Sequence, residues 1–157
     1  MDIRLLLMDC DGVLTDGRLY FSARGEELKV FDVRDGQGIV RWHNAGFKSG
    51  IISGRGAGEI IARRAGELGI EFVRVSTSDK VAAFEEIISS LGIDAANVAF
   101  VGDDVGDIDV MKRVGFAVAV GDAVKETKAV AAYVTNANGG RGAVREVIDL
   151  LLDGDEK

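Results

Sequence analysis

Short apolar runs alternate with amphipathic helical patterns along this chain of 157 residues. The runs are typical of buried strands and cover residues 4–8, 48–53, 71–75, 98–101, 117–120 and 133–134. Helical patterns cover residues 36–44, 57–68, 80–91 and 107–114, and a last one includes Val144 and Leu152. The alternation predicts an α/β fold: a three-layer, doubly wound parallel sheet with helices on both faces. Gly46, Gly69, Gly92 and Gly115 each follow a helical pattern, where a left-handed cap favours glycine.

Residues 18–33 interrupt this alternation. Two runs rich in strand-forming residues flank a polar turn at residues 22–26, which predicts a β-hairpin inserted near the strand ends. A two-stranded hairpin is marginal alone. A small lid or a contact between subunits is therefore as consistent with the pattern as a minor sheet edge.

Composition narrows the class of partner. The length suits a single domain over residues 1–157. The formal net charge of −7 argues against nucleic acid and anionic membrane surfaces, which need basic patches. The N-terminal apolar run is too short for a signal peptide or a membrane span, so a cytoplasmic protein is expected.

Two carboxylates follow the first apolar run directly. Asp9 and Asp11 stand where a buried strand ends and a glycine turn begins at Gly12. Unpaired carboxylates are costly to bury, which indicates a metal ion or another polar partner. An ordinary acidic turn would share this pattern, so other segments must supply the partner.

Three more predicted strands end in polar groups. Taken singly, each group has an ordinary role as a helix cap or a solvated first turn. The carboxyl ends of parallel strands meet at one edge of a sheet, so these groups are expected to converge with Asp9 and Asp11. They are Ser53-Gly54-Arg55, Asp79-Lys80 and Gly102-Asp103-Asp104-Val105-Gly106-Asp107.

The convergent set suits phosphoryl transfer. Asp9, Asp11 and Asp103 offer hard oxygen ligands for Mg²⁺. Ser53 and Lys80 can bind phosphate oxygens. With the metal and the lysine offsetting repulsion, Asp9 can attack phosphorus. Asp11 can then protonate the leaving oxygen and deprotonate the attacking water.

These motifs, in this order, resemble the four motifs of the haloacid dehalogenase-like phosphatases over nearly the whole chain. The resemblance implies that Asp9 is the nucleophile and that Asp11 is the general acid/base, with its backbone carbonyl on Mg²⁺. It makes Asp103 the third metal ligand and Asp107 a support for Lys80 or metal-bound water. Ser53, Gly54 and Lys80 become the phosphate binders, and Asp104 a supporting residue of open role.

A narrower resemblance involves the segments Gly-Glu-Glu-Leu-Lys at 25–29, Phe-Asp-Val-Arg-Asp-Gly-Gln-Gly at 31–38 and Gly-Gly-Arg-Gly-Ala-Val-Arg-Glu at 139–146. They resemble the phosphatases of 3-deoxy-D-manno-octulosonate (KDO) 8-phosphate, an acidic sugar phosphate of lipopolysaccharide biosynthesis. That family has a hairpin in place of a cap domain and forms homotetramers in which neighbouring subunits complete each active site. Arg34, Arg55 and Arg141 are the candidates for the sugar and its carboxylate, although surface arginines would give the same pattern.

Three alternatives remain open. Phosphatases of the related nine-carbon ketodeoxynononate 9-phosphate tend to carry Glu where Arg55 stands, so Arg55 favours the eight-carbon substrate. Receiver domains, which accept phosphate without being enzymes, also combine acids, a hydroxyl and a lysine, but their phosphoacceptor lies on a separate strand from the acidic pair. Such a non-enzymatic phosphoacceptor, or a non-catalytic homologue, is the less favoured alternative.

Overall fold

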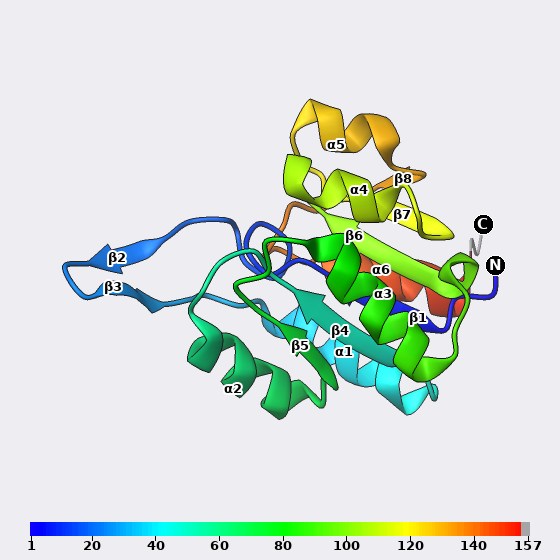
Figure 1. The fold of residues 1–157 in the computed structure, drawn as a ribbon, viewed down its shortest axis with the longest axis horizontal. Coiled ribbons are helices and arrows are strands. Elements are labelled where there is room, and N and C mark those ends of the chain that lie inside the picture. Colours follow the sequence, from blue (N-terminus) through cyan, green and yellow to red (C-terminus); the bar gives the residue numbers. More distant parts are fainter. Residues whose placement is uncertain (155–157) are drawn as a thin grey trace.

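A six-stranded sheet forms the centre of the molecule in the computed structural model, which describes residues 1–154 (Figure 1). The strand order is β5-β4-β1-β6-β7-β8, and all neighbouring strands run parallel. The predicted parallel α/β fold is therefore confirmed. The strands are β1 (Leu5–Met8), β4 (Lys48–Ile52), β5 (Phe72–Arg74), β6 (Val98–Gly102), β7 (Phe116–Ala119) and β8 (Tyr133–Val134).

Helices cover both faces of this sheet. On one side α1 contacts both α2 and α6, and on the other α4 contacts both α3 and α5. The helices are α1 (Val33–Asn44), α2 (Gly58–Leu68), α3 (Lys80–Leu91), α4 (Ile108–Met111), α5 (Lys125–Val130) and α6 (Ala143–Asp153). Two short 3₁₀ helices, η1 (Ala95–Asn97) and η2 (Val105–Asp107), precede β6 and α4. No helix among residues 1–154 is long and apolar enough to cross a membrane.

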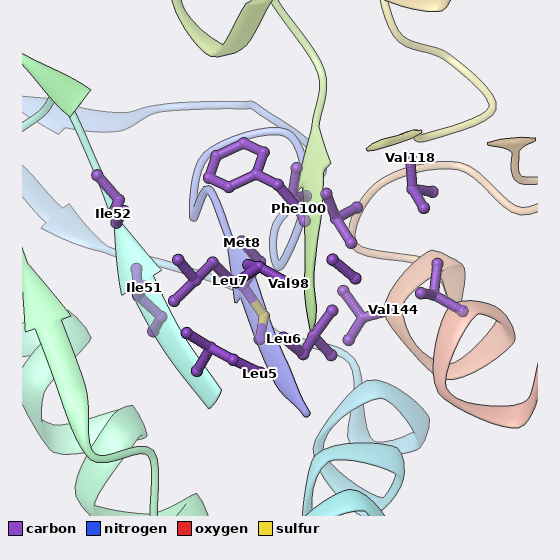
Figure 2. Close-up of a cluster of buried hydrophobic side chains, with 14 of the residues drawn as sticks. Leu5, Leu6, Leu7, Met8, Ile51, Ile52, Val98, Phe100, Val118 and Val144 are labelled. Carbon is purple, nitrogen blue, oxygen red and sulfur yellow. The ribbon is translucent and has the colours of Figure 1, made fainter. Parts of the chain in front are cut away.

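The central strand β1 is buried along its whole length. Leu5, Leu6, Leu7 and Met8 have no exposed surface, and β4 and β6 flank them (Figure 2). A strand covered on both faces reads as a continuous apolar run rather than an alternating one. This burial fixes the position at which β1 ends and the polar loop after it begins.

Several helix boundaries differ from the sequence prediction. Helix α1 begins at Val33 rather than residue 36, because the Asp32 side chain caps it by accepting from the backbone N–H of Arg34 and Asp35. The helix predicted over 107–114 is instead η2 followed by the single turn of α4. Helix α5 was not predicted from the sequence.

The predicted glycine caps hold at three of four positions. Gly46, Gly69 and Gly92 have positive φ angles of 92°, 73° and 63°. Gly115 does not adopt the left-handed conformation, so that prediction is wrong. A Cβ at Gly115 would lie 2.0 Å from the carbonyl oxygen of Ala96, which shows that close backbone approach excludes a side chain there.

The hairpin consists of β2 (Tyr20–Ser22) and β3 (Gly25–Leu28), which pair antiparallel. It extends away from the sheet, on the side opposite the two termini (Figure 1). The predicted insertion over 18–33 is too long at its end, since Val33 already belongs to α1. Phe21 at the tip is 68% exposed, so the hairpin carries apolar surface that nothing in residues 1–154 covers.

Candidate active site

The carboxyl ends of β1, β4 and β6 bring Asp9, Ser53 and Asp103 to one edge of the sheet, because each of these residues comes directly after the last residue of its strand. The chain passes from β1 toward β4 on one side and later returns to β6 on the other, so the edge is a topological switch point. A cavity of about 350 Å³ opens there. Its lining residues are Asp9, Asp11, Gly17, Ser53, Gly54, Arg55, Lys80, Asp103, Asp104, Val105, Gly106 and Asp107.

Asp9 is nearly buried, with 8% of its surface exposed. Its Oδ1 accepts a hydrogen bond from the backbone N–H of Cys10 at 2.7 Å, and its Oδ2 lies 3.4 Å from Lys80 Nζ. Burial raises the pKa of Asp9 to about 6, and the neighbouring Asp107 carboxylate adds to the effect. A bound cation would favour the ionised, nucleophilic form.

Lys80 is the first residue of α3, whose N-terminus is capped by Asp79. Its ammonium donates to Asp107 Oδ1 at 2.8 Å. Burial opposes the charged form of Lys80, but Asp107 and Asp9 outweigh it and raise the pKa. Lys80 therefore stays protonated beside Asp9, as an anion-binding group must.

Asp107 connects Lys80 with the loop after β6. Its second oxygen, Oδ2, accepts from the backbone N–H of Asp103 at 3.0 Å and of Asp104 at 3.4 Å. Asp104 accepts from the N–H of Val105 at 2.7 Å and so closes the same turn. Asp107 thus contacts both Lys80 and the loop backbone, and the supporting roles of Asp107 and Asp104 stay predictions.

Three carboxylates form a site that suits a divalent cation. One oxygen each from Asp9, Asp103 and Asp107 lies within 4.8 Å of the others. Asp103 Oδ1 is buried and has no hydrogen-bond partner among residues 1–154. Burial raises the pKa of Asp103 to about 9, and Asp9 and Asp107 add to the effect. All donors are hard oxygens, the ligands that Mg²⁺ takes; the sequence did not assign Asp107 to this set.

The Asp11 side chain lies outside that carboxylate cluster and contacts the hairpin segment instead. Its Oδ1 accepts from Lys29 Nζ at 2.6 Å, and Lys29 also donates to Glu26. Sequence reasoning missed both Lys29 and Glu26 as site residues. The only signal was their place in the segment 25–29, which carries the family resemblance but no strand-end position.

The three predicted arginine ligands are placed differently. Arg55 lines the cavity and forms ion pairs of 3.5 Å with Asp11 and Glu26. Arg34 and Arg141 are exposed and do not line this cavity. Their role in substrate binding stays a prediction.

The loop at residues 139–142 packs against the loop that follows β1. The backbone N–H of Gly140 donates to the carbonyl of Val13 at 2.9 Å. A Cβ at Gly139 would lie 1.7 Å from the Gly12 carbonyl oxygen, so only glycine permits this approach. The loop that carries Asp9 and Asp11 is thus held by a segment more than a hundred residues later.

Comparison with known proteins defines the class of this fold and site. The family model described as haloacid dehalogenase-like hydrolase matches residues 69–148. The KDO 8-phosphate phosphatase KdsC of Escherichia coli K12 is 48% identical over 151 residues, covering 96% of this chain and 80% of that protein.

Solved structures agree. The KDO 8-phosphate phosphatase of Yersinia pestis has a TM-score of 0.94 and 46% identity, covering 99% of this chain and 84% of that one. The enzyme of Moraxella catarrhalis, solved with a magnesium ion, a phosphate ion and KDO, has a TM-score of 0.93 and 38% identity, covering 98% of this chain and 87% of that one. This chain therefore belongs to the haloacid dehalogenase-like hydrolases, in the family of the KDO 8-phosphate phosphatases.

Proposed function

We propose that this protein is a Mg²⁺-dependent phosphomonoester hydrolase that converts KDO 8-phosphate to KDO and inorganic phosphate. The observation that carries the proposal is the arrangement of Asp9 beside Lys80, Asp103 and Asp107 at the switch point of the sheet. Family membership and a relative's complex with magnesium, phosphate and KDO support the choice of metal and substrate.

The proposed reaction has two steps. Asp9 attacks phosphorus and forms an aspartyl-phosphate, while Asp11 gives its proton to the departing sugar oxygen. Asp11 then takes a proton from water, whose oxygen attacks the aspartyl-phosphate and releases phosphate and free Asp9. Lys80 and Ser53, with the backbone at Gly54, bind the phosphate oxygens. Asp9, Asp103 and the Asp11 carbonyl, with Asp107 beside them, would hold Mg²⁺, which would supply neutralising charge.

Arg55 supports the eight-carbon substrate over the nine-carbon one. Its guanidinium lines the cavity and would offer a planar, bidentate partner to a sugar carboxylate. Hydrolysis of ketodeoxynononate 9-phosphate is the second candidate, and a non-enzymatic phosphoacceptor role is the least supported, because the family is one of hydrolases.

A homotetramer that works in the cytoplasm is part of the same proposal. The hairpin exposes Leu19, Phe21, Leu28 and Val30, and contact with other subunits would cover this apolar surface. Such packing would place active sites near subunit interfaces and let neighbours contribute to substrate binding. Nucleic acid and membranes are not expected as partners, given the net charge of −7.

The test is phosphate release from KDO 8-phosphate and ketodeoxynononate 9-phosphate, with and without Mg²⁺. We expect a higher kcat/KM for the eight-carbon substrate and loss of turnover when EDTA removes the metal. A preference for the nine-carbon substrate would overturn the substrate assignment. Stable self-phosphorylation from acetyl phosphate without turnover would instead identify a phosphoacceptor.

A further inference from the structure

Lys29 is a buried lysine outside the four motifs. It follows β3, and its side chain is only 1% exposed. Its ammonium donates to Asp11 Oδ1 at 2.6 Å and to Glu26, whose side chain is 7% exposed. Removing an ammonium from water costs free energy, and the charged hydrogen bonds to the two carboxylates offset this cost.

Arg55 closes this group into a ring of alternating charge. Its Nε lies 3.5 Å from Asp11 Oδ2, and its Nη2 lies 3.5 Å from Glu26 Oε2. Two cations and two carboxylates thus join the hairpin to the loops after β1 and β4. Lys29 and Glu26 are well covered and Arg55 is half exposed, so the hairpin side of the ring is the fixed side.

The ring makes the two oxygens of Asp11 unequal. Oδ1 is taken by the short hydrogen bond from Lys29. Oδ2 is buried and accepts no hydrogen bond from residues 1–154, while Asp11 itself lines the cavity. Among residues 1–154, Oδ2 makes only the longer ion pair with Arg55 and no hydrogen bond, so it is the oxygen available to exchange a proton with a bound molecule.

We infer that Lys29, held in place by Glu26, is a positioning residue that orients the Asp11 carboxylate so that Oδ2 transfers the proton. This inference rests on the proposed function, in which Asp11 is the general acid/base. Under this inference the hairpin contributes directly to the chemistry. Without the Lys29 ammonium, the Asp11 carboxylate would lose the 2.6 Å hydrogen bond that fixes its orientation. The Asp11 side chain would then be held only by its 3.5 Å ion pair with Arg55.

The test uses aryl phosphates, which lack the sugar and so bypass its recognition. The series runs from phenyl phosphate, whose leaving group needs a proton, to 2,4-dinitrophenyl phosphate, whose leaving group departs without one. For Lys29→Met we expect kcat/KM to fall about 10- to 100-fold with phenyl phosphate and less than about 3-fold with 2,4-dinitrophenyl phosphate, since general acid catalysis is worth about 10²–10⁴-fold. The plot of log kcat/KM against leaving-group pKa becomes steeper.

Matched variants control for folding. Lys48→Met removes an exposed lysine that pairs with Glu71 at the opposite end of the sheet and should leave the slope unchanged. Glu26→Gln keeps Lys29 and should steepen the slope less than Lys29→Met; it carries the test if Lys29→Met does not fold by circular dichroism. A uniform loss across the series, or no loss, would overturn the inference. If the wild type hydrolysed the aryl phosphates but not KDO 8-phosphate, the proposed substrate would be rejected. The comparison of Lys29→Met with the wild type across the aryl phosphates would still test the inference.

Discussion

The sheet edge and the hairpin each place a largely buried lysine beside a carboxylate with a proposed catalytic role, but they do so by different means. Lys80 starts a helix anchored on a sheet that is buried on both faces, and it contacts Asp9 and Asp107. Lys29 comes from a two-stranded extension with exposed apolar residues, and it contacts Asp11 and Glu26. The side of the site that is proposed to bind phosphate is therefore built on the buried core. The side that is proposed to transfer the proton depends on a peripheral element.

The largest effect should come from the core side. Asp9→Asn removes the proposed nucleophile while keeping its size, and kcat should fall more than about 10³-fold, because an amide does not form the covalent intermediate. Steady-state phosphate release measures it. Asp2→Asn, an exposed residue paired with Arg4, is the matched control. Full activity in Asp9→Asn would refute the mechanism.

Metal binding provides a second test of the sheet-edge side of the site. Mg²⁺ at about 100-fold above its dissociation constant should stabilise the wild type by about 2.7 kcal/mol, a rise in Tm of about 5–10 °C. Asp103→Asn should lose most of this rise, because it removes one of three clustered carboxylates. Scanning calorimetry measures it. Asp94→Asn, at the exposed cap of η1, should keep the rise; equal rises in both variants would contradict the site.

A substitution in the hairpin should change the oligomeric state of the protein. Phe21→Asp places a charge on the tip residue that is 68% exposed, and the proposed tetramer should dissociate because desolvating that charge is costly. Light scattering should show a mass near that of one chain, while circular dichroism stays unchanged. Val124→Asp changes an exposed valine before α5 and should leave the mass unaltered. An unchanged mass in Phe21→Asp would exclude the tip from the interface.

A smaller effect is expected at the hydrogen bonds that join Asp35 of α1 to the start of α6. Asp35 is buried and accepts from the backbone N–H of Arg145 and Gly142, and burial raises its pKa from 3.8 to about 6. The folded state thus favours the protonated carboxyl, so its contribution to stability is full below pH 3.8 and is lost as the pH rises through about 6.

The difference in unfolding free energy between wild type and Asp35→Asn should therefore be about 1 kcal/mol larger at pH 5 than at pH 7.5. Urea unfolding at the two pH values measures the change, and the other titrating groups cancel in the difference. A difference that does not vary with pH would show that the pKa of Asp35 is not raised.

The core side was largely predictable from the sequence, and the hairpin side was not. Continuous apolar runs indicated strands buried on both faces, and the parallel arrangement then brought Asp9, Ser53 and Asp103 to one edge. The contact between Asp11 and Lys29 joins residues 18 apart through a hairpin whose docking depends on tertiary structure, so no local pattern indicated it. Helix α5 is a single short segment with a weak apolar pattern, and Gly115 is required by a neighbouring backbone rather than by its own φ.

The packing of Gly139 and Gly140 against the loop of Gly12 and Val13 has a consequence for biosynthesis. The ribosome adds Asp9, the proposed nucleophile, more than a hundred residues before the loop that packs against its own loop. A nascent chain that stops before residue 139 would contain all four motifs and still lack the support that holds the first one. Catalytic competence should therefore arise late, only after the segment leading into α6 has left the exit tunnel.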